Sequence, residues 1–576
     1  QISYRKGDIT FTEKRLYKIV KVDGLAYGSL DLDISKDTDI DDLEGYRLDE
    51  SGKLLETLEK ENIKRTGYSD HFFDDHEQFS ASFKGLETGD FVAFEYELED
   101  ELFFKQQMIA MGASIEIAEK RVTVPEGVRC AVLNDPEGAV SVSGNVYTVK
   151  SRPALKAEDN GPALRERIPF LGILFEGSTE PTWESHSRMV WEMTREIPVL
   201  SDATRQELQA LPAVQNREEF IRRTLKHVSE NVRYVAIEDG EGRFIPRDVN
   251  LVHQRQYGDC KDMAYYAVAI LRTGGVTAHP VLALTRRAGP VFEEFPMHQF
   301  NHVIVAVELD GETMGLKNFE IGGKPVLIAD LTDKYTAVPM IGDHLEDTSI
   351  LPVMETGAPL LKIPAAPPVE SSRNYVLDIT FGADRSIAVK LTETKRGHAA
   401  AAEKSFRENM KQKDENEIYR DWIHDMVPGA EMKDVTVEMD AREVRTEVTF
   451  TAGNLGTDVN DIIYFIPNLV DARKKGYTQR TRESDMVLSH RSVKEVRVNV
   501  TVDPTFRIQK IPEAGIVESD FFTGSLDARQ NGQTVSYDVR FEWKVNRIPA
   551  DAYPDFRKEY RKYLKVAKAP IQLKPV

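Results

Sequence analysis

Apolar and polar residues alternate through roughly the first 160 residues, and this period of two predicts β-strands. In 91–98, every second residue from Val92 onward is apolar or aromatic, so these side chains share one face of a strand. Segments 140–143 and 146–149 flank Gly144-Asn145, a pair typical of a two-residue hairpin turn. We therefore predict an antiparallel β-sandwich-type domain over residues 1–162.

The pattern changes to a helical period in the middle of the chain. Apolar residues recur at spacings of three and four in 220–232, before a β-like run at 232–237. A second apolar helical segment follows Cys260 and ends at Gly274-Gly275. The strands that come next are predicted near 278–286, 301–309 and 325–330. Helices followed by antiparallel strands are typical of an α+β fold, which we predict for a core domain over residues 163–357.

A proline-rich stretch, 359–368, reads as a linker, and strand patterns return after it. Alternation is clear in 444–450 and 496–502, and Asn531-Gly532 precedes a further alternating strand, as in a hairpin. Helices are predicted at 397–412 and 553–563. We predict a β-rich domain over residues 358–576. The chain is thus expected to be a multidomain α+β protein, with two antiparallel β-sandwich-type domains flanking the core.

Composition and charge narrow the classes of function. The chain has 576 residues, too many for one hydrophobic core. Its net charge of −20 disfavours nucleic acid and anionic lipid as partners, because both need a basic surface. No apolar run reaches the roughly 18 residues that a membrane span needs. The sequence leaves the oligomeric state open.

The chain has two cysteines, Cys130 and Cys260, which excludes a disulfide framework. Cys130 lies in an apolar strand-like segment and is predicted to be a buried thiol. The chain starts at Gln1, so we expect a processed product from which a signal peptide has been removed.

Cys260, His302 and Asp330 have the order of a thiol acyl-transfer triad. A cysteine at a helix start faces free backbone N–H groups and the positive end of the dipole, which favour the thiolate. His302, held on a strand, would serve as base and acid, and Asp330, at the end of a later strand, would orient it. Each residue alone has an ordinary structural explanation, so the prediction depends on the three together. Asp333 is the rival for the third role.

A metal site is the alternative for the same region. His298 and His302 are four residues apart, and His279 and Cys260 are available. That spacing suits a helix face, whereas Pro296 and the β-branched run after His302 indicate loop and strand. We therefore expect no metal and no cofactor.

Two aspartates flank the nucleophile. Asp259 and Asp262 would oppose thiolate formation unless they face solvent or pair with Lys261 or Arg255.

Five stretches of the chain resemble the bacterial transglutaminase-like superfamily, in the subgroup with an N-terminal DUF3857 domain. They are 232–235, 257–262, 270–276, 300–305 and 548–554. The resemblance implies a papain-like core with a Cys260–His302–Asp330 triad. It also implies an oxyanion site built from the backbone N–H of Cys260 and an upstream donor. The family places proline or a small residue after the aspartate, where this chain has Leu331.

The predicted function is a thiol-dependent hydrolase or acyltransferase, of protease or amidase type. It would cleave or transfer an amide in a peptide, a protein or a peptide-bearing glycan through a cysteine thioester. Relatives of this kind resemble exported proteins of Gram-negative bacteria, which implies a periplasmic or cell-surface location. The alternative is a catalytically silent scaffold of the cell envelope, whose β domains bind polysaccharide or protein. The two hypotheses differ in whether Cys260 and His302 contact each other and are reachable from solvent.

Overall fold

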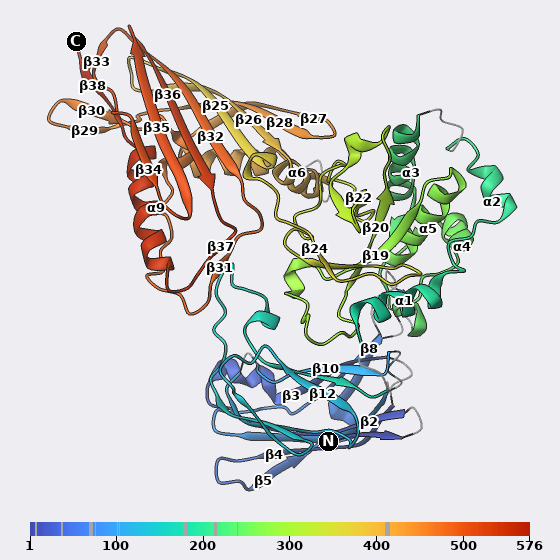
Figure 1. The fold of residues 1–576 in the computed structure, drawn as a ribbon. Helices are drawn as coiled ribbons and strands as arrows, with labels where there is room; N and C mark the ends of the chain where they lie inside the picture. Colours follow the sequence, from blue (N-terminus) through green and yellow to red (C-terminus); the bar gives the residue numbers. More distant parts are fainter. Residues whose placement is uncertain are drawn as a thin grey trace. The chain divides into compact units, whose positions relative to one another are not determined.

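The computed structural model describes residues 1–5, 8–35, 39–67, 73–74, 76–100, 102, 104–113, 115–176, 181–211, 216–238, 240–408, 410 and 415–576 (Figure 1). The fold is multidomain and rich in strands. The chain forms two compact units. The first contains Gln1–Leu155, Ala163–Thr332 and Thr348–Lys362, and the second contains Lys156–Pro162, Asp333–Asp347 and Ile363–Val576. The crossing at Lys362 lies inside the proline-rich stretch that the sequence predicted to be a linker.

The N-terminal part of the first unit consists of four small sheets with antiparallel pairing. Their strand orders are β1-β2-β9-β4-β5, β3-β8-β6, β10-β15-β12 and β11-β14-β13. The strands are β1 (Ile2–Arg5), β2 (Asp8–Lys18), β3 (Ser29–Ser35), β4 (Asp39–Leu48), β5 (Leu54–Thr57), β6 (Ile63–Gly67), β8 (His76–Ser82), β9 (Phe91–Asp100), β10 (Gln106–Ala110), β11 (Ile117–Thr123), β12 (Arg129–Leu133), β13 (Val140–Ser143), β14 (Val146–Arg152) and β15 (Phe170–Leu174).

The predicted alternation and hairpin both occur in this part. Val92, Phe94 and Tyr96 of β9 point into a hydrophobic core shared with the β3-β8-β6 sheet. Gly144 has φ +60 in the turn that joins β13 to β14, a conformation that glycine adopts without strain. Because β15 pairs with both β10 and β12, strand pairing continues to Leu174. The domain boundaries proposed from the sequence remain predictions.

The rest of the first unit is an antiparallel six-stranded sheet with helices. The sheet order is β21-β22-β20-β19-β23-β24. Its strands are β19 (Ala278–Ala283), β20 (His302–Glu308), β21 (Phe319–Ile321), β22 (Lys324–Ala329), β23 (Ser349–Pro352) and β24 (Leu361–Lys362). The helices are α1 (Trp183–Thr194), α2 (Asp202–Glu207), α3 (Arg217–Asn231), α4 (Val249–Arg255) and α5 (Cys260–Thr273). Two parallel two-residue pairs complete it: β16 (Arg233–Tyr234) with β18 (Tyr257–Gly258), and β17 (Ile237–Glu238) with β7 (Phe73–Asp74).

Helix α5 is the centre of this α+β region. All its residues from Lys261 to Leu271 are buried, because α5 packs against α3 and α4 and against β19 and β20. At its end, a Cβ on Gly274 would lie 2.2 Å from the Phe220 ring, so only glycine lets α3 approach this closely. The apolar run after Cys260 therefore reports a fully buried helix rather than a one-sided surface helix.

The second unit is an eight-stranded sheet with helices and a smaller sheet. The strand orders are β27-β28-β26-β25-β32-β36-β35-β34 and β29-β30-β38-β33, and β31 pairs with β37. The strands are β25 (Ser372–Phe381), β26 (Ile387–Arg396), β27 (Glu431–Met439), β28 (Glu443–Ala452), β29 (Thr457–Val459), β30 (Ile462–Phe465), β31 (Met486–Val487), β32 (Val493–Val502), β33 (Phe506–Lys510), β34 (Gly515–Glu518), β35 (Phe522–Asn531), β36 (Thr534–Trp543), β37 (Arg547–Ile548) and β38 (Ile571–Pro575). The helices are α6 (His398–Glu408), α7 (Glu415–Met426), α8 (Leu469–Ala472) and α9 (Tyr553–Ala567).

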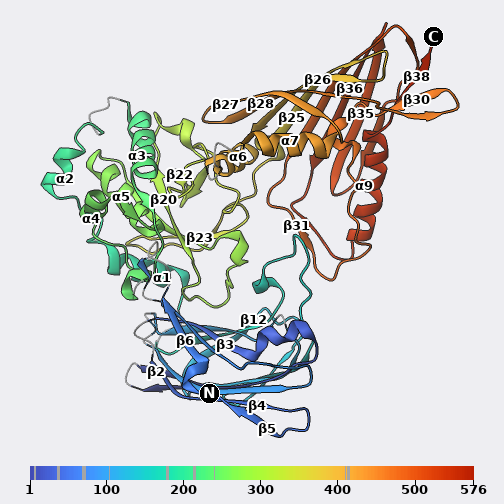
Figure 2. The ribbon, with the colours of Figure 1, turned by 180° about the vertical axis from the view of Figure 1, so that it is seen from behind.

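This unit differs from the predicted antiparallel sandwich in two ways. Strands β25 and β32 pair in parallel, which is possible because more than one hundred residues connect them. Helices also supply part of its hydrophobic core: α9 runs beside β34 and β35 (Figure 1), and α7 lies along the same sheet (Figure 2). The predicted hairpin at Asn531-Gly532 is confirmed between β35 and β36. The helix predicted at 397–412 is seen as α6, and the end of that range falls partly outside the described residues.

None of the helices in the described parts of the chain is long and apolar enough to cross a membrane.

Candidate active site

Cys260 is the first residue of α5, and the sequence around it folds as a capping box. Asp259 is the N-cap, and its side chain accepts hydrogen bonds from the backbone N–H groups of Lys261 at 3.1 Å and Asp262 at 3.3 Å. The Asp262 carboxylate in turn accepts from the N–H of Asp259 at 3.3 Å. Among the described hydrogen bonds, the N–H of Cys260 donates to no protein acceptor. The thiol thus sits at the positive end of α5 beside a backbone donor.

The two flanking aspartates are buried and paired. Asp259 forms an ion pair with the ammonium of Lys261, as the sequence predicted. Asp262 accepts a hydrogen bond from the backbone N–H of Arg247 at 2.8 Å, and the Arg247 guanidinium lies 3.9 Å away; Arg255, the other predicted partner, is not among these contacts. Burial, helped by the charge of Asp262, raises the pKa of Asp259. Both carboxylates are therefore turned to local partners.

His302 and Asp330 meet because they lie at the same end of two paired strands. His302 is the first residue of β20, and Asp330 directly follows β22, which pairs antiparallel with β20. The distance from His302 Nε2 to Asp330 Oδ2 is 2.8 Å. The other carboxylate oxygen, Oδ1, accepts from the backbone N–H of Thr332 at 2.9 Å and from its hydroxyl at 2.8 Å. The side chains of His302 and Asp330 are 11% and 3% exposed. Asp330 therefore orients the imidazole and closes a turn at once.

The imidazole of His302 also hydrogen-bonds the thiol of Cys260. Burial by itself would lower the pKa of His302, but the charge and hydrogen bond of Asp330, followed by the contacts with Cys260, raise it to about 10. At neutral pH the ring is therefore a cation next to the thiol. The three residues predicted from the sequence are brought together as a Cys–His–Asp array.

The other residues considered from the sequence have separate partners. Asp333 Oδ1 accepts from the backbone N–H groups of Tyr335 at 3.2 Å and Thr336 at 3.1 Å, so it closes its own turn. His279 Nε2 lies 3.2 Å from Glu308. Cys130, in β12, is only partly buried, and burial raises the pKa of its thiol. Of the two cysteines, only Cys260 has a histidine partner among the described contacts.

One group beside the site was missed from the sequence, a cluster of histidine and aromatic rings around His298. The Nδ1 of His298 lies 3.3 Å from Nε2 of His186 in α1. The ring of His298 stacks on Phe104, with centroids 4.4 Å apart, and contacts Phe244 edge-on. The members lie up to about two hundred residues apart in the chain, so no local pattern announces the cluster.

The buried His186–His298 pair makes stability sensitive to acid. Burial lowers the pKa of His186, which is 7% exposed, to about 4, and that of His298 to about 3. A histidine with a lowered pKa binds its proton more readily in the unfolded chain, so stability is lost as the pH falls below the ordinary value of 6.5. We expect His186 alone to lower the free energy of unfolding by about 2 kcal/mol between pH 6.5 and 4.5. Urea unfolding at the two pH values measures this loss. The non-titrating variant His186→Gln should reduce it, and an equal loss in the variant would contradict the prediction.

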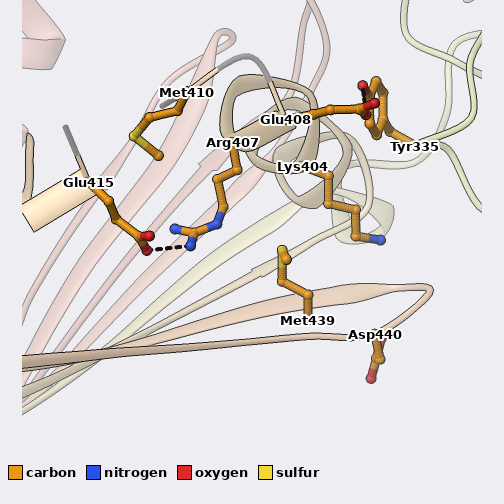
Figure 3. A pocket seen from close by; sticks show the side chains of 8 residues that line it. All are labelled: Tyr335, Lys404, Arg407, Glu408, Met410, Glu415, Met439 and Asp440. Carbon is orange, nitrogen blue, oxygen red and sulfur yellow. Dashed lines mark hydrogen bonds and ion pairs between the residues drawn. The ribbon is translucent and has the colours of Figure 1, made fainter. Parts of the chain in front are cut away.

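A cavity of about 520 Å³ lies in the second unit, between α6, the start of α7 and the turn after β27 (Figure 3). Its charged groups have protein partners: Arg407 pairs with Glu415, Glu408 contacts Tyr335, and the Lys404 ammonium donates to the carbonyl of Ala441 at 2.8 Å. None of its eight lining residues is a cysteine, serine or histidine. It offers no nucleophile with a base.

Comparison with known proteins gives matches at the two ends of the chain. Residues 5–157 match the family model DUF3857 and residues 461–573 match DUF3858, each described as a "Domain of Unknown Function with solved-structure structure". The DUF3857 part of the predicted resemblance is thereby confirmed. No curated protein matches the chain.

Two solved structures are similar to this chain. A "putative protease" from Parabacteroides distasonis ATCC 8503 is 12% identical, with a TM-score of 0.64, over 99% of this chain and 96% of that one. A "putative cysteine protease" from Cytophaga hutchinsonii is 10% identical, with a TM-score of 0.14, over 56% of this chain and 78% of that one. The first likeness extends over nearly the whole length of both chains. The chain thus has DUF3857 and DUF3858 regions within a fold similar to that of the Parabacteroides protein.

Proposed function

We propose that this protein is a thiol-dependent hydrolase or acyltransferase that acts on an amide bond. The observation that carries the proposal is the array at the start of α5. There His302 contacts both the Cys260 thiol and the Asp330 carboxylate, 2.8 Å away. In this assignment Cys260 is the nucleophile, His302 the proton donor and acceptor, and Asp330 the group that orients and charges the imidazole.

The reaction follows from these positions. The Cys260 thiolate attacks the amide carbon, and the new oxyanion accepts the backbone N–H of Cys260. The imidazolium of His302 then gives its proton to the leaving nitrogen, the C–N bond breaks, and a thioester and a free amine result. The neutral imidazole next takes a proton from water, whose oxygen attacks the thioester. The thiolate leaves as an ion pair with the reprotonated ring. An amine in place of water would give acyl transfer.

The same observation supports an enzyme over a silent scaffold. A scaffold has no need for a buried aspartate that holds a histidine charged beside a thiol, because burying charged groups costs free energy. Cys260 and His302 are both partly exposed, so the pair is within reach of solvent. The fold likeness to a protein described as a "putative protease" agrees with a peptide, a protein or a peptide-bearing glycan as substrate. A transglutaminase-like core and a periplasmic or cell-surface location are further parts of the proposal.

Thiol alkylation tests the proposed pair without knowledge of the substrate. We expect iodoacetamide at pH 7 to label Cys260 at least about tenfold faster than Cys130, because only Cys260 has a cationic partner that favours the thiolate. Peptide mass spectrometry of timed samples measures both rates in one protein, so Cys130 is the internal control. His302→Ala should slow Cys260 and leave Cys130 unchanged. Equal rates at the two cysteines in the wild type would refute the proposal. Amine release from peptide and cell-wall fragments would then identify the substrate class.

A further inference from the structure

A glutamine of the N-terminal β region holds the segment that leads into the strand of His302. Gln106 is the first residue of β10, and its side-chain amide makes two hydrogen bonds to the backbone of His298. Its Nε2 donates to the carbonyl of His298 at 2.8 Å, and its Oε1 accepts from the N–H of His298 at 2.9 Å. Both groups belong to the first compact unit. A side chain far away in the sequence thus takes the role of a neighbouring strand at this point.

The residues between His298 and His302 are held as well. The side chain of Gln299 accepts from the N–H of Phe292 at 2.9 Å and donates to its carbonyl at 3.0 Å. The N–H of Asn301 donates to the carbonyl of Ala283 at 3.2 Å, beside the β19–β20 pairing that includes His302. Since the connection is braced at 298, 299 and 301, it has little freedom to absorb a displacement of His298. The position of His298 is therefore passed on to His302.

The N-terminal β region makes a second contact with the same residue. The ring of Phe104 stacks on the ring of His298, with the planes inclined by 20° and the centroids 4.4 Å apart. Gln106 therefore fixes the backbone of His298, and Phe104 fixes its ring. Both residues lie within the stretch that matches DUF3857, 5–157.

We propose that Gln106 is a positioning residue for His302, and that the DUF3857 region thereby forms part of the catalytic apparatus. The inference rests on the proposed function. His302 must keep Asp330 on one side and the Cys260 thiol on the other, and a displacement of about 1 Å at a reacting group costs on the order of 10²-fold in rate. Without Gln106, the N–H and carbonyl of His298 lose these two partners, and the segment shifts to regain others.

Gln106→Ala tests the proposal, with Gln107→Ala of the same strand as the matched control. We expect Gln106→Ala to lower kcat at least tenfold with KM within about twofold, because the change acts on the reacting groups and not on substrate contacts. Its rate of Cys260 alkylation at pH 7 should fall toward that of His302→Ala. Gln107→Ala should keep both values within about twofold of the wild type. Hydrogen exchange of the 298–301 amides should rise in Gln106→Ala alone.

The outcomes separate this inference from the proposed function. Fast labelling of Cys260 and an unchanged kcat in a folded Gln106→Ala protein would overturn the positioning role and leave the proposed function standing. A wild type whose Cys260 reacts no faster than Cys130 would overturn both. If Gln106→Ala does not fold, Phe104→Leu decides, because it removes the stacking contact and keeps an apolar side chain. It is expected to lower kcat and Cys260 labelling in the same direction, and unchanged values would overturn the proposal.

Discussion

Replacing Cys260 with serine is expected to lower kcat/KM by at least about 10³-fold on any amide substrate that the protein turns over. Serine places a hydroxyl where the thiol was, but a hydroxyl needs a base to remove its proton. His302 has a pKa of about 10 and is already protonated at neutral pH, so it cannot serve as that base. Steady-state kinetics on the amine-releasing substrate measure the loss.

Cys130→Ser is the matched control for this variant. Cys130 packs at the edge of a hydrophobic core in the N-terminal β region, and its contacts include Tyr147 but no histidine. Its replacement should leave kcat/KM within about twofold of the wild type. Equal losses in the two variants, or an active Cys260→Ser protein, would remove Cys260 from the role of nucleophile.

Replacing Asp330 with asparagine has the second largest expected effect, a loss of between about 10²- and 10⁴-fold in kcat. The asparagine carbonyl can still accept from Thr332, so the turn is kept while the charge beside His302 is lost. The charge of Asp330 is the main cause that raises the pKa of His302, so this pKa falls in the variant. The imidazolium is then lost at a lower pH, and the alkaline limb of the pH profile of kcat/KM moves toward acid.

The same pair makes a contribution to stability with a definite sign. Because the folded pKa of His302 lies above 6.5, its stabilising effect is complete below pH 6.5 and is lost as the pH rises through about 10. The difference in unfolding free energy between the wild type and Asp330→Asn should therefore shrink between pH 7 and 10. Asp333→Asn is the control: it should keep the wild-type alkaline limb, because Asp333 closes its own turn. A shifted limb in Asp333→Asn, with a wild-type profile in Asp330→Asn, would exchange the two assignments.

The local elements of the site could be predicted because their signals are local. The apolar run after Cys260 covers one helix, and a helix is defined by residues three and four apart. Apolar residues at strand spacing around 301–309 and 325–330 likewise mark β20 and β22. The hairpin turns at Gly144 and Gly532 follow from the positive φ that glycine tolerates, +60 in both cases.

Long-range pairing could not be predicted in the same way. The parallel contact of β25 with β32 joins strands more than one hundred residues apart, and the alternating pattern of each strand is the same for a parallel or an antiparallel neighbour. The addition of β15 to the sheet of β10 and β12 is a choice of the same kind. Gln106 and Phe104 gave no signal either, because their partner His298 lies almost two hundred residues further along the chain.

The sequence by itself determined the nucleophile, its place at the start of a helix and the strands that carry the base and the carboxylate. These depend on residue type and on periodicity over a few turns or strand residues. Only the tertiary structure decided that Asp330 pairs with His302, that Lys261 and Arg247 hold the flanking aspartates, and that Gln106 braces the histidine segment. Each of these contacts depends on which strand ends and loops meet in space, and that meeting is set by burial of the whole core rather than by any neighbouring residues.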